Sequence, residues 1–182
     1  MRIKILAIFL LTLLVAGAQP QTEEKRTPPA DQSAAATLRG MVASRFVGTW
    51  KLVSYTQKTE AGNTMYPFGQ YPIGLAMFDS GGHMSVQIMQ IPHATFTAGY
   101  EHATAEQVKA VYQAYFAYYG TWSVDEMNEQ LVEIIKASNQ LDYVNRMQTR
   151  PYFFDKNQLS LRNLVELNGR QYSIATVWER LP

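Results

Sequence analysis

From Phe46 onward, the sequence consists of short strand-like segments separated by turn residues. Apolar and polar side chains alternate from Phe46 to Tyr55, a pattern typical of a strand with two different faces. Asp79–Gly82, Asp155–Asn157 and Asn168–Gly169 supply hairpin turn residues between later segments. The expected strands are 46–57, 73–78, 83–90, 120–124, 130–137, 147–154, 159–167 and 171–181. Eight strands joined mostly by hairpins predict an all-β antiparallel fold, either an up-and-down barrel or a sandwich.

The two ends of this series favour the barrel. Gly48-Thr49-Trp50 lies in the first expected strand, and Trp178-Glu179-Arg180 lies in the last. If these strands pair, the sheet closes on itself and has no free edges. An eight-stranded barrel leaves room inside for one small ligand.

One segment changes periodicity from that of a strand to that of a helix. Its apolar residues recur every three or four positions, which predicts an amphipathic helix inserted after the third strand. They are Val108, Val111, Tyr112, Tyr115 and Tyr119. Thr104-x-x-Gln107 has the pattern of a capping box at its start. Its tyrosine-rich face is expected to pack on the barrel, to form a lid at the cavity mouth, or both.

The first 18 residues have the pattern of a signal peptide. Arg2 and Lys4 precede an apolar stretch, Ile5 to Val15, and Ala16-Gly17-Ala18 is a small-x-small cleavage pattern. The stretch is shorter than the ~20 residues that span a bilayer, although an uncleaved anchor is the alternative. We expect export to the periplasm or outside the cell, with no integral membrane span after cleavage. Residues 19–44 are then a polar linker, and residues 45–182 the barrel domain.

Composition excludes several classes of site. The chain has no cysteine and a net charge of +1, so it offers no thiol chemistry and no basic footprint for nucleic acid. His83, His93 and His102 lack metal-ligand spacing, and we expect no metal. A nucleophile elbow and a phosphate-binding glycine loop are both missing from the sequence. We therefore expect no cofactor.

Five blocks of sequence together resemble the lipocalin-like domain proteins of bacteria and fungi. They are Phe46–Ser54, Tyr66–Gly74, Asp79–Gln87, Tyr119–Asp125 and Val177–Arg180. The resemblance implies a calycin-type barrel, and most such proteins resemble ligand carriers. It also implies a structural role for Gly48 and Trp50, with Arg180 lying across the indole ring.

The resemblance breaks down in one region. The family pattern leads us to expect a histidine-rich fifth strand and a Pro-x-Trp-x-Gly connection. This chain has Val132–Ile135 and Leu141–Asn145 there, whereas Arg150 matches a family arginine. A function that depends on those histidines is therefore not expected here.

The candidate ligand site combines polar strand residues with aromatic ones. We favour Ser85, Gln87 and Met89 facing the cavity, although the alternate residues of that strand could do so instead. Glu133 and Arg150 have apolar neighbours; either both face solvent, or both face inward and pair to orient a polar or carboxylate-bearing ligand. The predicted ligand-binding residues are Ser85, Gln87, Met89, Tyr112, Tyr115, Tyr119, Trp122, Glu133, Arg150 and Tyr152.

Three functions are compatible with these residues. The first is an exported protein, monomeric or weakly dimeric, that binds a small apolar or amphipathic molecule. The second is an isomerase, cyclase or hydratase that uses Glu133 as a general base with tyrosine donors. The third is a fully packed barrel that serves as a structural or interaction module. The volume of the cavity distinguishes the third from the other two.

Overall fold

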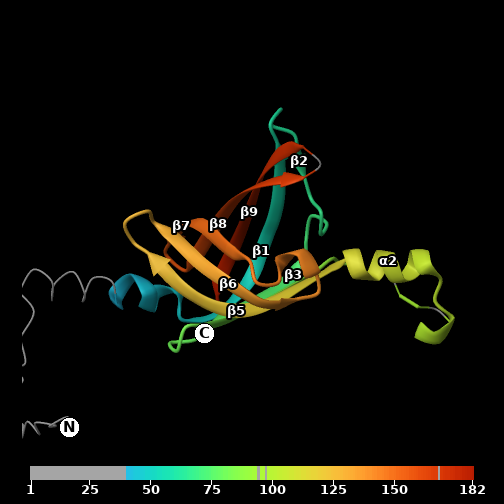
Figure 1. The fold of residues 1–182 in the computed structure, drawn as a ribbon, viewed down its shortest axis with the longest axis horizontal. Helices are drawn as coiled ribbons and strands as arrows, with labels where there is room; N and C mark the ends of the chain where they lie inside the picture. The colour runs from blue at the N-terminus through green and yellow to red at the C-terminus, as the bar shows by residue number, and fades with distance from the viewer. Residues whose placement is uncertain (1–39, 94, 97, 168) are drawn as a thin grey trace, which may run out of the picture.

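The strands follow one another around a closed antiparallel barrel (Figure 1). The computed structural model describes residues 40–182 except 94, 97 and 168, so the predicted signal peptide and most of the linker lie outside the described residues. The strands are β1 (Gly48–Thr59), β2 (Thr64–Met65), β3 (Ile73–Phe78), β4 (His83–Met89), β5 (Tyr115–Asp125), β6 (Gln130–Ser138), β7 (Met147–Asp155), β8 (Gln158–Leu167) and β9 (Arg170–Arg180). The helices are α2 (Ala105–Gln113) and the 3-10 turns η1 (Tyr100–His102) and η2 (Leu141–Tyr143); residues 40–46 are also helical.

Pairing between the first and last long strands closes the barrel. β1 pairs with β3 on one side and with β9 on the other, and Trp50 stands opposite Arg180. β2 pairs with the end of β1 and is an addition to the eight strands of the barrel. The predicted eight-stranded up-and-down barrel with an inserted helix is therefore confirmed. The predicted Asn168–Gly169 turn includes residue 168, which is not described, but β8 and β9 on either side of it pair up to Leu167 and Arg170.

One end of the barrel is filled by aromatic side chains. Phe46, the last residue of the helical segment, is fully buried there, with its ring 4.8 Å from that of Phe154 and 5.7 Å from that of Trp122. Val42 and Ala43 pack against the same core, so the folded unit includes residues ahead of position 45. We call this the closed end.

Arg180 seals the closed end from outside. Its guanidinium carbon lies 4.2 Å from the centre of the Trp50 ring, and it donates hydrogen bonds to the carbonyls of Val47 and Arg45. Gly48 permits this approach, because a Cβ there would lie 2.5 Å from Arg180 Nη1 and the backbone φ is 137°. Glycine at position 48 thus leaves room for the Arg180 side chain of β9 to lie against β1.

The prediction that the helix extends to Tyr119 is wrong. α2 begins with the expected capping box between Thr104 and Gln107, but it ends at Gln113, and Tyr115 begins β5. β5 pairs along its length with β4 and β6, and these two ladders outweigh the local helical spacing. Tyr115 and Tyr119 therefore belong to a strand, and the predicted tyrosine face of the helix does not form.

Candidate functional site

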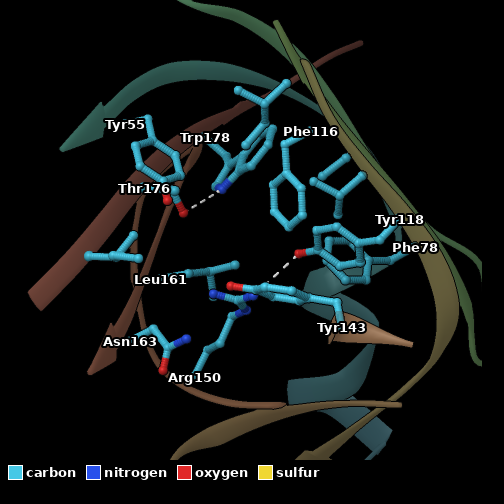
Figure 2. A pocket seen from close by; sticks show the side chains of 14 residues that line it. Tyr55, Phe78, Phe116, Tyr118, Tyr143, Arg150, Leu161, Asn163, Thr176 and Trp178 are labelled. Carbon is cyan, nitrogen blue, oxygen red and sulfur yellow. Dashed lines mark hydrogen bonds between the residues drawn. The ribbon is translucent and has the colours of Figure 1, made fainter. Parts of the chain in front are cut away.

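A cavity lies inside the barrel beyond the closed end, and residues from most of the strands line it (Figure 2). Its volume is about 30 Å³, enough for about two water molecules. Most of the wall is apolar: Ala76, Phe78, Val86, Ile88, Phe116, Leu161, Ile174 and Trp178. The polar lining residues are Tyr55, Tyr118, Tyr143, Arg150, Asn163 and Thr176. The sequence therefore builds an apolar chamber with a few polar groups, as in small-molecule sites.

Glu133 on β6 and Arg150 on β7 face inward and form an ion pair. The Arg150 Nε–H donates to Glu133 Oε2 over 2.7 Å, and the Tyr118 hydroxyl lies 3.5 Å from both the same oxygen and Arg150 Nη2. Glu133 is completely buried and Arg150 is only 9% exposed. Both charges are held in the barrel core, where each would be very costly without the other.

The surroundings stabilise the charged form of Arg150. Burial alone lowers the pKa of the guanidinium, but the oxygens of Tyr118 and Glu133 outweigh burial and hold that pKa above its ordinary value. Burial raises the pKa of Tyr118, so its hydroxyl stays protonated, and burial raises the pKa of Tyr55 to about 12. Both phenols are therefore neutral hydrogen-bonding groups in the cavity wall at physiological pH.

Glu133 does not line the cavity directly, whereas Arg150 does. The second carboxylate oxygen, Oε1, is buried and has no hydrogen-bond partner among the described residues. Arg150 lies at the cavity surface with Asn163 and Tyr143 beside it (Figure 2). A molecule in the cavity would meet the guanidinium, and Glu133 would hold that guanidinium in place.

The prediction that Ser85, Gln87 and Met89 line the cavity is wrong. The alternate residues of β4, Met84, Val86 and Ile88, are buried, and Val86 and Ile88 line the cavity. Both sets include apolar side chains, so the alternation along this strand did not reveal its inner face. Pairing with β3 and β5 fixes the register, because side chains alternate between faces and only one set can enter the core.

The predicted aromatic site residues lie outside the cavity. Tyr112, on α2, donates from its hydroxyl to the carbonyl of Asn139 over 2.6 Å, and Tyr115 and Tyr119 are on the outer face of β5.

Trp122 and Tyr152 face the interior at the closed end, where each packs against Phe46. The structure therefore brings only Arg150 of the predicted set to the cavity wall, with Glu133 directly behind it.

Sequence reasoning missed most of the polar lining. Tyr118 was obscured by the helical interpretation, although Phe116, Tyr118 and Trp122 alternate as buried positions of a strand.

A bulge in β1 between Leu52 and Ser54 shifts the register so that Tyr55 faces inward. Asn163 and Thr176 each lie two positions from a buried apolar residue, which is the only sequence signal for them. Tyr143 comes from η2, and no periodic pattern identifies it.

The described residues contain no group of three or more side chains suited to holding a metal ion. His83 Nδ1 lies within hydrogen-bond distance of Asp79 Oδ2, 3.0 Å away, beside the β3–β4 turn. None of the described helices is both long enough and apolar enough to cross a membrane.

Comparison with known proteins agrees with the architecture. Residues 47–181 match the sequence model of a family described as the lipocalin-like domain. No curated protein matches the chain. The match covers the barrel from the residue before β1 to the residue after β9. The chain therefore belongs to the lipocalin-like domain family.

Proposed function

We propose that this protein is exported and binds one small, neutral, amphipathic molecule in its barrel, with the polar end of the molecule against Arg150. The observation that carries the proposal is the placement of a buried guanidinium, held by Glu133 at 2.7 Å, in the wall of an otherwise apolar cavity. A buried ion pair contributes little net stability compared with apolar packing, so stability alone gives little reason for this pair. Polar groups placed in an apolar cavity instead orient ligands.

The charges of the pair determine the kind of head group that fits. Arg150 and Glu133 carry opposite unit charges, so the pair is neutral as a whole. A carboxylate would bring an uncompensated negative charge into the barrel, whereas a carbonyl or hydroxyl would accept a hydrogen bond from Arg150 without that cost. We therefore narrow the expected ligand from polar or carboxylate-bearing to neutral and hydrogen-bond accepting.

The size of the cavity indicates how a ligand enters. A volume of about 30 Å³ does not hold a chain of several carbons. Tyr143 is half-buried, comes from the short turn η2, and reaches into the cavity beside Arg150 (Figure 2). Among the lining residues it is the one carried by neither a barrel strand nor a long helix. Outward movement of Tyr143 would enlarge the space next to the guanidinium.

The geometry favours binding over catalysis. A general base must come within hydrogen-bond reach of the proton that it removes. Glu133 is separated from the cavity by Arg150 and binds it through Oε2. Its other oxygen, Oε1, has no hydrogen-bond partner among the described residues but is buried and does not line the cavity. The isomerase, cyclase or hydratase alternative would therefore require a movement that brings this oxygen to a substrate.

Export rests on the sequence of the first 18 residues, with its basic start, apolar stretch and small-residue cleavage pattern. Expression of the full chain in a bacterial host, followed by mass measurement of the protein in each cell fraction, tests this part. We expect the exported form to lack residues 1–18.

Titration of the protein with 1-octanol and with octanoate, followed by native mass spectrometry, tests the binding proposal. We expect a one-to-one complex with octanol, at least tenfold weaker binding of octanoate, and loss of octanol binding in Arg150→Met. Arg162→Met is the matched control, because Arg162 is exposed on the outer side of β8. If neither probe binds, the barrel is a packed module and the proposal is wrong. If Arg150→Met binds octanol as well as the wild type does, the guanidinium does not hold the polar end of the ligand, and the proposal is also wrong.

A further inference from the structure

Nine outward-facing residues of β3, β4 and β5 form a continuous surface without charged side chains. Strand register aligns its residues in three rows across the three strands. The rows are Ile73–Met89–Tyr115, Leu75–Gln87–Ala117 and Met77–Ser85–Tyr119. We call these nine residues the neutral face. None of them is buried, and Ile73, Leu75, Met77 and Tyr119 are exposed large apolar side chains.

Charged residues lie beside the neutral face and on the rest of the barrel surface. Lys51 of β1 is paired with Leu75 and borders the face. On β8, Arg162 and Glu166 flank the exposed Leu164, and Lys58 and Glu179 are exposed on β1 and β9. A lone apolar residue among charges, such as Leu164, is ordinary for a protein surface. Nine adjacent surface positions without a charge are unusual. Depletion of charged side chains, with enrichment in aromatic and methionine side chains, is typical of the core of a protein interface.

The neutral face is uneven, with ridges and hollows. Ile73, Leu75 and Met77 of β3 form one ridge, and Tyr115 and Tyr119 of β5 form another. Ser85 on β4 and Ala117 on β5 are smaller. A hollow of about 360 Å³ opens over β3 and β4, with Lys51 of β1 in its wall, and one of about 270 Å³ opens over β4, β5 and the end of β6. Gln87 borders both hollows and accepts a hydrogen bond from the Tyr115 hydroxyl over 3.3 Å. A partner therefore needs apolar side chains to fill the hollows more than it needs hydrogen-bonding groups.

We propose that the neutral face binds a second copy of this chain and forms a reversible symmetric dimer. Contact between two identical surfaces around a two-fold axis tends to bring like charges together, so an uncharged face is the one best able to meet its own copy. The face has no cluster of cations to attract an anionic membrane or a nucleic acid. Its apolar ridges and hollows offer a copy the shapes it would need to interdigitate.

The extent of the face matches a weak dimer. Its four most exposed apolar side chains present roughly half of their surface, on the order of 400 Å² together, given ~200 Å² for a large side chain. A standard stable interface buries ~800 Å² on each partner. The remaining five residues and the segments beside the face must supply the rest. An association in equilibrium with monomer is therefore expected.

α2 is a second, independent observation that points to a partner. It connects Met89 of β4 to Tyr115 of β5, the end row of the neutral face, and it projects beyond the barrel (Figure 1). It has nine residues, none of them buried, and Val108 and Tyr112 on its apolar side are 41% and 48% exposed. Isolated helices of that length are marginal in water. A second copy docked on the neutral face would provide α2 with the packing that its own barrel does not.

Sedimentation velocity of the full chain, as its host processes it, tests the proposal over concentrations from 1 to about 500 µM, a range suited to weak association. We expect the wild type to shift from monomer to dimer, and Leu75→Glu to weaken association at least tenfold. Leu164→Glu is the matched control: Leu164 is 76% exposed, against 42% for Leu75, and lies between Arg162 and Glu166 on β8. It should dimerise like the wild type.

The result does not depend on one variant. Near-UV circular dichroism checks that Leu75→Glu is folded, and Tyr119→Glu at a more exposed position of the face should give the same loss. A wild type that stays monomeric throughout overturns the proposal, as does a dimer that survives both face variants. A monomeric wild type that instead floats with neutral phosphatidylcholine vesicles would overturn it in favour of a membrane surface.

Discussion

A guanidinium stands at position 150, where the neighbouring barrel interior is mostly apolar. The fold tolerates this buried guanidinium because the carboxylate of Glu133 pairs with it. The 2.7 Å contact compensates both buried charges. Removing either partner leaves a buried charge alone, whereas removing both leaves an apolar core that can repack. The pair therefore behaves as one unit, with Tyr118 as a neutral third member.

Urea unfolding of single and double variants should show this coupling. Glu133→Leu and Arg150→Met should each lower the free energy of unfolding by about 3–5 kcal/mol, the usual cost of breaking a buried pair. The double variant should be more stable than either single variant, because no charge then remains buried. Additive losses in the double variant would show that the two residues stabilise the barrel independently.

At the scale of elements, η2 contributes a side chain to the cavity wall, that of Tyr143, from outside the strand ladders. Strand residues are held by ladders on both sides, but Tyr143 lies in a three-residue turn between β6 and β7. Its ring packs 5.2 Å from that of Phe116, which holds it in place. We therefore expect this turn to be the part of the cavity wall that moves when a ligand enters.

Stopped-flow fluorescence with 1-octanol should detect this gate. Tyr143→Ala should raise the association rate by roughly tenfold, because entry no longer waits for the ring to move. Leu141→Ala, in the same turn but 79% exposed, should leave the rate unchanged. Equal rates in the wild type and Tyr143→Ala would place the entrance elsewhere.

Comparison of these elements with the sequence shows what local patterns can predict. Hairpin turns and the pairing of the first and last strands were predictable, because turn residues and the matching tryptophan-containing segments are visible locally. The end of α2 was not, since Tyr112, Tyr115 and Tyr119 satisfy the helical period, and only pairing with β4 and β6 makes the last two strand residues. The inner face of β4 and the effect of the bulge at Val53 likewise depend on neighbours far away in the sequence.

At the scale of the whole molecule, the buried phenols connect stability to pH. Tyr55 keeps its proton up to a pKa of about 12, against an ordinary value of 10.0, chiefly because burial disfavours the phenolate, and burial raises the pKa of Tyr118 as well. Between pH 10 and 12 the unfolded chain has lost these protons while the folded chain retains them. Stability is therefore fully present below pH 10 and falls as pH rises above it.

Urea unfolding between pH 8 and 11.5 should measure this fall. We expect a slope of about 1.4 kcal/mol per pH unit for each buried tyrosine once the unfolded state has titrated. Tyr55→Phe should make the slope shallower, and Tyr119→Phe, at an exposed phenol, should not change it. A slope unaffected by Tyr55→Phe would assign the alkaline loss of stability to other groups.

Closure of the barrel by β1 and β9 also governs when the chain can fold during its synthesis. Arg180 donates to the carbonyl of Val47, 133 positions earlier, so the ribosome releases β1 long before its partner exists. Contacts so distant in sequence form late. Until β9 arrives, β1 and β8 each expose an unpaired row of backbone groups that can recruit other chains. A stop codon early in the last strand would thus release an open, aggregation-prone sheet instead of a slightly shortened barrel.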